Sequence, residues 1–503
     1  MNPTDFIVVG AGSAGCVVAR GLAERGFHVR LLEAGPPAAN PASDRPAYYP
    51  RLFGSALDWG FHSQRQVALA GRRLPQPRGR GPGGSTLLNA MIWMPPTAAD
   101  REALATAGGA AWQPAVFDQA VQAIEAWVRP ENPRWLGEGS RQFLTLADTA
   151  LEAFPHRRMN QLGRRRTAAD VLAESPAASR VCRQVALVDR LEIQAQRVVG
   201  VRLHDAAAGT QGTKWLTAKR GVILAAGTFQ SPAILMRSGI GPAAELRRCG
   251  IEVRRDVAAV GAGLTDHLVM PVVYSTPALV PFRLPRALRD VARWQTMGSG
   301  PLTSNLAEVG GFASVTVASR DTPATVQFHV TPTDYLRYPA DGSTAAMTLA
   351  VTDSQPRSRG RVGIDSSDAA APPRIDPGYL TDDSDLDVLV AGVRLARSLA
   401  ARLPAVSGGG QETLPGRRRD EDQGIAKAVR RFAQTLYHPV GTCALGQATQ
   451  SVVDPELRLR GVEGCWVVDA SVLPMLPIAN PNATVMALAY HFSRGWPLEN
   501  ASS

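Results

Sequence analysis

A chain of 503 residues is too long for one simple core, so we expect two or three domains. Hydrophobic residues make up 45% and charged residues 19% of the chain, as in an ordinary folded protein, and no apolar run approaches the roughly 20 residues that cross a bilayer. The net charge of +10 comes mainly from dispersed arginines without interleaved aromatic residues, so we predict no nucleic-acid partner and no membrane partner.

The cysteines also exclude some classes of protein. There are five, scattered along the chain, with neither C-x-x-C spacing nor the even number of a disulfide framework. We interpret them as small buried residues or idle thiols, and we expect no metal centre. A strand-like run begins at about residue 5, which leaves no room for a signal peptide ahead of it. We therefore expect a cytoplasmic protein.

The N-terminal segment predicts a β-α-β unit. An apolar run at 6–9 ends in the motif G-x-G-x-x-G, residues 16–25 are compatible with a helix, and a second apolar run at 29–33 ends in an acid. A buried strand followed by this glycine motif and a helix is the pattern of a dinucleotide-binding turn.

Each residue of this motif has a physical role in such a turn. Gly10 permits the tight turn, Gly12 lets the backbone approach a pyrophosphate, and Gly15 lets the helix pack close to the strand. Glu33 follows Gly10 by 23 positions and would bind a ribose hydroxyl. A glycine-rich turn without a ligand would leave this acid unexplained.

The remaining elements are predicted in two blocks. The first has extended chain and loops over 36–96, helices at 115–128 and 140–153, strand-like alternation over 181–203 and a buried strand at 221–227. From about residue 271, a mostly antiparallel sheet is predicted from segments at 309–317, 325–331, 346–351 and 361–364. A helix at 384–402, a linker or mobile loop at 408–410 and 416–423, and short strands and turns over 430–503 complete the chain.

Four further segments carry chemical motifs. Residues 79–90 contain adjacent glycines and small polar residues, which offer backbone N–H groups to a planar or anionic ligand. Residues 227–241 predict a strand-end turn, a helix and a glycine-closed helix end. The others are Tyr-His-Pro-Val-Gly-Thr at 437–442, and Val-Asp-Ala-Ser at 468–471 followed by Asn-Pro-Asn-Ala-Thr-Val-Met at 480–486.

Together, in this order, these motifs resemble those of the glucose-methanol-choline (GMC) oxidoreductases, which bind FAD. The resemblance runs from residue 5 to about 490 and includes Leu-Thr-Asp-His at 264–267. It implies an α/β fold with a discontinuous Rossmann-like FAD-binding domain and a substrate domain built on a mostly antiparallel sheet. We expect the FAD-binding domain over 1–270, with lid segments within 36–180, the substrate domain over 271–435, and a return to the FAD-binding domain over 436–503.

The resemblance also implies the residues of the site. Leu87 and Leu88 leave no histidine where some members attach FAD covalently, so we expect non-covalent FAD. The implied cofactor-binding residues are Gly10, Gly12, Ser13, Ala14, Gly15, Glu33, Gly84, Ser85, Asn89, Ala90, Val188, Asp469, Ala470, Asn480 and Pro481.

The catalytic pair implied by the resemblance is His438 and Asn480, with Asn482 as the alternative second residue. A histidine of near-neutral pKa accepts the proton of an alcohol, and an amide donates a hydrogen bond to the developing alkoxide. We interpret Asp266 and His267 as buried, hydrogen-bonded residues, and His329 likewise unless its strand turns it toward the pocket.

The function implied is FAD-dependent oxidation of an alcohol, a primary alcohol on a small or aromatic molecule, to the aldehyde. The electron acceptor is molecular oxygen or another oxidant, and we expect an oxidase rather than a dehydrogenase. The alternative is a flavin-dependent lyase or decarboxylase without net redox chemistry, since a scaffold does not determine a reaction. A choline-type substrate would need an acid and an aromatic cage, for which Glu308 is the candidate acid.

Overall fold

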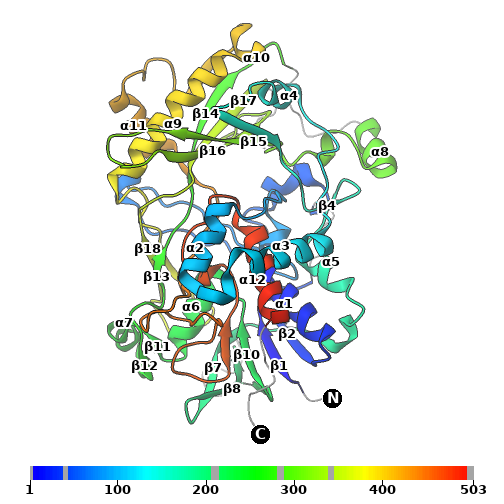
Figure 1. Ribbon diagram of the computed structural model, residues 1–503, viewed down its shortest axis with the longest axis vertical. Coiled ribbons are helices and arrows are strands. Elements are labelled where there is room, and N and C mark those ends of the chain that lie inside the picture. The colour runs from blue at the N-terminus through cyan, green and yellow to red at the C-terminus, as the bar shows by residue number, and fades with distance from the viewer. Residues whose placement is uncertain (1–3, 38–42, 205–213, 280–287, 338–344, 496–503) are drawn as a thin grey trace.

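The computed structural model describes residues 4–37, 43–204, 214–279, 288–337 and 345–495, and arranges them around two main sheets (Figure 1). One sheet is parallel and lies in the lower half of that view, and the other is antiparallel and lies in the upper half. The predicted α/β class, with a discontinuous Rossmann-like unit and a second antiparallel sheet, is confirmed. Among the described residues, no helix combines the length and the apolar character that a membrane span requires.

The parallel sheet gathers strands from distant parts of the chain. Its order is β22 (Cys465–Val467), β10 (Gly221–Leu224), β1 (Phe6–Val9), β2 (Val29–Glu33) and β6 (Val181–Val185). All four residues of β1 are buried, because β10 and β2 pair with it on its two edges and helices cover the sheet. This is why the central strand is a continuous apolar run rather than an alternating one.

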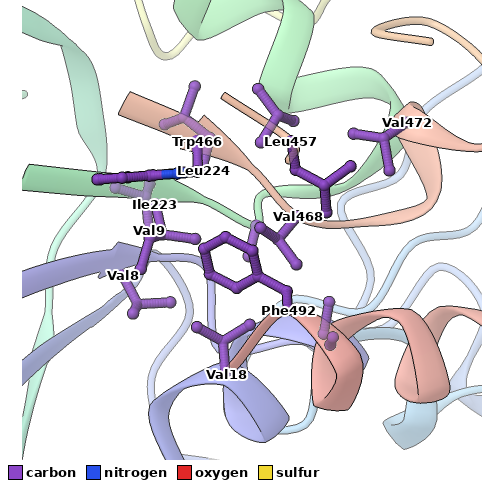
Figure 2. Close-up of a cluster of buried hydrophobic side chains, with 14 of the residues drawn as sticks. Val8, Val9, Val18, Ile223, Leu224, Leu457, Trp466, Val468, Val472 and Phe492 are labelled. Atoms are coloured by element: carbon purple, nitrogen blue, oxygen red, sulfur yellow. The ribbon is translucent and has the colours of Figure 1, made fainter. Parts of the chain in front are cut away.

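Two helices from opposite ends of the chain cover this sheet. Helix α1 (Ser13–Glu24) packs against α12 (Pro481–Gly495), and Figure 2 shows Val18 of α1 and Phe492 of α12 among strand residues such as Val9. Burying one such apolar side chain contributes roughly 1.5–3 kcal/mol. This core places the first glycine motif and the 480–486 segment side by side, although they are far apart in the sequence.

The second sheet is antiparallel throughout. Its described part has seven strands: six lie side by side, and the short strand β21 (Gln434–Thr435) pairs with one end of β14. The order of the others is β20 (Gln411–Leu414), β14 (Leu268–Ser275), β17 (Ala346–Asp353), β16 (Ala324–Thr331), β15 (Val309–Val315) and β3 (Leu151–Pro155). Helix α9 (Asp383–Ala401) packs on β17, which buries both faces of that strand.

Other helices and strands complete the described fold. The helices are α2 (Ala98–Gly108), α3 (Pro114–Val128), α4 (Glu138–Leu144), α5 (Ala168–Ala173), α6 (Gly227–Arg237), α7 (Ala243–Arg248), α8 (Leu288–Met297), α10 (Pro404–Ser407) and α11 (Asp422–Phe432). The remaining strands are β4 (Asn160–Gln161), β5 (Arg164–Arg165), β7 (Val188–Gln194), β8 (Arg197–Leu203), β9 (Trp215–Thr217), β11 (Ile240–Gly241), β12 (Arg255–Asp256), β13 (Ala262–Leu264), β18 (Gly360–Gly363) and β19 (Arg374–Asp376).

Three predicted elements differ from the structure. The helix predicted over 140–153 ends at Leu144, and residues 151–155 instead form the edge strand β3, which pairs with β15. The strand predicted at 361–364 is β18, which joins β13 and β19 rather than the large sheet. Strand β20 lies between the two predicted linker stretches, 408–410 and 416–423, and pairs with β14, and helix α11 begins at Asp422 inside the second stretch. The strands β3, β18 and β20 are each determined by pairing with a strand that is distant in the sequence, and the local sequence does not indicate that partner.

Candidate active site

A large cavity lies between the carboxyl ends of the parallel strands and one face of the antiparallel sheet. The segments that follow β1, β10 and β22 all reach its wall, at Gly10, Ala225 and Asp469. Strands β16 and β17 contribute His329 and Ala350 from the other side. Open parallel sheets bind their ligands at the carboxyl ends of the strands, so this is where a site is expected.

The structure brings together almost all of the residues predicted to hold the cofactor. Gly15 is the exception, because a Cβ atom there would lie 1.8 Å from the carbonyl oxygen of Gly10, which shows that Gly15 faces the turn and allows close packing. The cavity wall contains Gly10, Gly12, Ser13, Ala14, Glu33, Gly84, Ser85, Asn89, Ala90, Val188, Asp469, Ala470, Asn480 and Pro481. Their contact with a cofactor stays a prediction.

Two glycines from different motifs meet at this wall. A Cβ atom on Gly84 would lie 2.6 Å from the Cα atom of Gly12, and Gly84 has a φ of +51°, which L side chains rarely adopt. A Cβ atom on Gly12 would meet only the Cα atom of Gly84, at 3.9 Å. The first glycine motif and the 79–90 segment therefore approach backbone to backbone and leave an open surface beside the start of α1, as a pyrophosphate requires.

The Glu33 carboxylate ties the same two segments together. It accepts hydrogen bonds from the backbone N–H groups of Ala11 at 3.0 Å, Gly35 at 2.8 Å and Gly81 at 3.0 Å. Burial raises the pKa of this carboxyl, and the three N–H donors oppose that shift. Glu33 thus has a structural role that the motif did not reveal, and it still lines the cavity where a ribose hydroxyl would lie.

Asp469 holds the opposite side of the cavity. Its Oδ2 atom accepts hydrogen bonds from the Gly227 N–H at 2.8 Å and the Ser231 hydroxyl at 2.6 Å, and its Oδ1 atom accepts one from the Ser471 N–H at 2.8 Å. The 227–241 and 468–471 motifs are therefore one structural unit. Burial raises the pKa of this carboxyl, and its hydrogen-bond donors oppose the shift.

His438 and Asn480 meet on the cavity wall. The Nδ2 atom of Asn480 lies 3.2 Å from the Nε2 atom of His438, and the Oδ1 atom of Asn480 accepts a hydrogen bond from Gln327 at 3.2 Å. Asn482 points elsewhere, since its Oδ1 atom accepts the Ser13 hydroxyl at 2.7 Å. Of the two asparagines left open by the sequence, the geometry pairs Asn480 with the histidine.

The loop that carries His438 is held in an unusual conformation. Tyr437 has a φ of +68°, a left-handed value that is costly for a bulky side chain. Asp266 accepts the His438 backbone N–H at 2.7 Å and the Thr435 hydroxyl at 2.6 Å, and Arg78 donates to the Tyr437 carbonyl at 2.7 Å. This network forces the turn that presents the imidazole to the cavity.

Further histidines lie next to this pair. His267 is fully buried and contacts His438 through their two Nδ1 atoms at 3.0 Å, consistent with the predicted hydrogen-bonded role. His329 lines the cavity, and neither of its ring nitrogens makes a hydrogen bond of ordinary geometry. Burial and the neighbouring His267 and His329 hold the pKa of His438 well below its usual 6.5, which keeps its imidazole neutral at pH 7.

Sequence reasoning missed an aromatic wall. The rings of Tyr49 and Phe53 lie 5.9 Å apart, the rings of Phe53 and Tyr437 lie 5.3 Å apart, and all three residues line the cavity. Tyr335 also lines it. Tyr49 and Phe53 come from the stretch predicted as loops, where no periodicity indicates which side chains face inward.

Glu308, the candidate acid for a cationic substrate, does not line the cavity. Its carboxylate is buried and accepts hydrogen bonds from Gly137 at 2.7 Å, from Ser140 at 2.6 Å and from Ser304 at 2.5 Å. Glu33 and Asp469 are the only acids on the described wall, and each is engaged by three donors. The wall around His438 is therefore aromatic and offers no unengaged acid, and its one described arginine, Arg78, donates to the Tyr437 carbonyl.

Comparison with known proteins identifies the family. Sequence models of GMC oxidoreductases match residues 4–163 and 150–269 for the N-terminal part and residues 356–489 for the C-terminal part. The chain belongs to the GMC oxidoreductase family. It is 33% identical to an alcohol dehydrogenase [acceptor] of Pseudomonas putida, over 96% of this chain and 94% of that protein.

Other GMC oxidoreductases are similar over their whole length. The chain is 31% identical to a pyridoxine 4-oxidase of Microbacterium luteolum, over 99% of this chain and all of that protein. The crystal structure of pyridoxine 4-oxidase from Mesorbium loti superposes with a TM-score of 0.84 at 27% identity, over 98% of this chain and 99% of that one. These relatives are named for the oxidation of alcohols, and their names include both an oxidase and a dehydrogenase.

Proposed function

We propose that this GMC oxidoreductase binds FAD without a covalent bond and oxidises a primary alcohol on a neutral aromatic molecule to the aldehyde. The observation that carries this proposal is the meeting of His438 Nε2 and Asn480 Nδ2, 3.2 Å apart, on a cavity that the glycine motifs also line. The close approach of Gly12 and Gly84 fits a pyrophosphate, and Val188 lines the same cavity, where we propose that its backbone contacts the adenine. FAD, when bound, accepts a hydride from the alcohol carbon.

The residues of the chain supply proton transfer and orientation. A substrate hydroxyl lying beside both His438 and Asn480 would donate its proton to the neutral Nε2 atom and accept a hydrogen bond from the amide, in exchange for the direct contact between the two side chains. The amide stabilises negative charge on the oxygen as the proton leaves, and it cannot compete for that proton. The low pKa of His438 keeps the Nε2 atom unprotonated at neutral pH.

The substrate class follows from the wall beside this pair. Tyr49, Phe53 and Tyr437 offer a continuous aromatic surface, which suits a planar ring. No unengaged acid lies on the described wall, so a quaternary ammonium substrate would lack a counter-ion there. The pyridoxine 4-oxidase relatives are named for an aromatic alcohol of this kind.

The mode of cofactor binding and the acceptor are part of the proposal. Leu87 and Leu88 are buried, and neither can form the covalent link that a histidine provides in some members of the family. We therefore expect acid precipitation of the protein to release all of its FAD into the supernatant. We further propose molecular oxygen as the acceptor.

An anaerobic titration tests the proposed function. Purified holoprotein is mixed with benzyl alcohol, pyridoxine, methanol or choline, and the flavin band at roughly 450 nm is followed. We expect bleaching by an aromatic alcohol and not by choline, with return of the band on admitting air. Substrate consumption with a flavin that stays oxidised would overturn the proposal in favour of the lyase or decarboxylase alternative.

A further inference from the structure

The sequence analysis interpreted His267 as a buried structural residue, and the arrangement around it indicates more. Its Nδ1 atom lies 3.0 Å from the Nδ1 atom of His438, and its Nε2 atom lies 3.0 Å from the carbonyl oxygen of Ser354. Asn480 lies on the other side of His438, next to its Nε2 atom. The three side chains and the carbonyl form one line of hydrogen bonds that ends at the proposed reaction centre.

The carbonyl gives this line a direction. A carbonyl oxygen only accepts hydrogen bonds, so the Nε2 atom of His267 carries a hydrogen. Burial lowers the pKa of His267 to about 4, so at pH 7 the ring is neutral and its Nδ1 atom has a lone pair. The Nδ1 atom of His438, facing that lone pair, must then be the donor.

We infer that His267 is a positioning residue that holds His438 in the tautomer with the proton on Nδ1 and the lone pair on Nε2. This inference rests on the proposed function, because Nε2 is the atom that faces Asn480 and would accept the substrate proton. The opposite tautomer would point an N–H at the substrate and could not act as a base. A second partner that fixes the tautomer of a functional histidine is a recurrent device in proteins.

The amide on the far side agrees with this direction. Gln327 donates to the Oδ1 atom of Asn480, which leaves the Asn480 N–H₂ group facing His438. An N–H₂ group requires an acceptor, so Nε2 of His438 must offer its lone pair. The Ser354 carbonyl at one end of the line and the placement of the Gln327 amide at the other therefore agree on one tautomer.

Burial and packing make His267 suited to this role. The side chain is fully buried, and its backbone carbonyl accepts the N–H of Leu436, in the same loop that carries His438. Asp266, the preceding residue, accepts the backbone N–H of His438. The 264–267 segment thus controls both the backbone and the ring of His438.

Two substitutions of His267 test whether it positions His438 through a hydrogen bond or only fills the space beside it. In His267→Gln, the amide oxygen accepts from His438 and the amide N–H₂ donates to the Ser354 carbonyl, so the tautomer should be kept. His267→Leu fills space but offers no acceptor. The test uses the alcohol that reduces the wild-type protein. We expect flavin reduction to slow about 10–100-fold in His267→Leu, the size of effect seen when a residue that supports a functional histidine is lost. His267→Gln should recover most of this rate.

The tautomer itself is measured by ¹⁵N NMR of the holoenzyme labelled at its histidines, with His438→Gln used to assign the signals. We expect Nε2 of His438 to show the shift of an unprotonated ring nitrogen in the wild type and in His267→Gln, and a mixture of tautomers in His267→Leu. A protonated Nε2 in the wild type, or an unchanged spectrum in His267→Leu, would overturn the inference. Normal flavin reduction by His438→Gln would instead overturn the proposed function, so the two failures are distinct.

Discussion

Asp266 accepts the backbone N–H of His438 through its Oδ1 atom at 2.7 Å. Its other oxygen accepts the hydroxyls of Thr435 and Tyr379, so one buried carboxylate gathers three donors from two segments. This explains how a turn with Tyr437 in the left-handed region remains stable, since the surrounding hydrogen bonds over-determine it.

Removal of this carboxylate is predicted to affect both stability and activity. Asp266→Ala leaves three donors without an acceptor, which we expect to lower the free energy of unfolding by about 3 kcal/mol and to slow flavin reduction. Asp266→Asn keeps one acceptor oxygen and should lose less. Urea unfolding measures the first quantity, with Asp321→Ala, at an exposed site, as the control. Equal unfolding energies for Asp266→Ala and the control would contradict this account.

The two asparagines of the 480–486 segment are predicted to give different phenotypes. Asn480→Ala removes the donor beside His438, so flavin reduction should slow about 10²-fold, an effect larger than any loss of bound flavin. Asn482→Ala removes the partner of the Ser13 hydroxyl at the start of α1 and leaves His438 untouched. We expect it to weaken flavin retention more than chemistry. Stopped-flow reduction and flavin-to-protein ratios measure the two effects, and interchanged phenotypes would refute the assignment.

Gly12→Ala tests the cofactor cradle. The added methyl group has no protein atom nearer than 3.9 Å, and Gly12 is not in a left-handed conformation, so the apoprotein should unfold at an unchanged urea concentration. The methyl group projects from a residue of the cavity wall, where we place the pyrophosphate. We expect a large loss of bound FAD, measured by absorbance. Full FAD content in this variant would show that the phosphates lie elsewhere.

The buried histidines predict a dependence of stability on pH. Burial lowers the pKa of His156 to about 4, below the ordinary 6.5, so the unfolded chain binds a proton that the folded chain does not. The stability from this histidine is complete above pH 6.5 and is lost as the pH falls from 6.5 toward 4.

Other buried groups also change stability with pH. Burial raises the pKa of Asp353 to about 6, so this carboxyl stabilises the folded protein more as the pH falls, opposite to His156. A variant is therefore needed to isolate the contribution of His156. His156→Gln should flatten the dependence of the unfolding free energy on pH by up to about 1.4 kcal/mol per pH unit below pH 6. Urea unfolding at several pH values measures both slopes. Parallel curves for the variant and the wild type would show that His156 is protonated in the folded protein.

Much of the parallel unit could be predicted from sequence, because its determinants are local. The apolar runs at 6–9 and 29–33 and the glycines between them specify two strands and a turn without reference to the rest of the chain. The helix begins at Ser13 rather than at residue 16, since the turn ends directly after Gly12. Residues named from the resemblance, such as Asn89 and Ala470, lie on the cavity wall although they are distant in sequence.

Other parts could not be predicted, because they depend on long-range pairing. Residues 151–155 form a strand only because β15 offers them an edge, and no helical or strand period over 140–153 records that partner. The same holds for His329, whose neighbours across the sheet are Gly310 and Ala350. The absence of a side chain on Gly310 makes room for the His156 ring, 5.3 Å from that of His329, but the register that aligns these residues is a property of the folded sheet.

The central claim is that His438 accepts the proton of an alcohol as the alcohol is oxidised. The most direct test is anaerobic single-turnover reduction of the flavin in His438→Ala, with the aromatic alcohol that bleaches the wild-type protein. We predict that the flavin spectrum and content remain those of the wild type while the rate of reduction falls about 10²–10⁴-fold. A rate near that of the wild type, at saturating alcohol, would contradict the account.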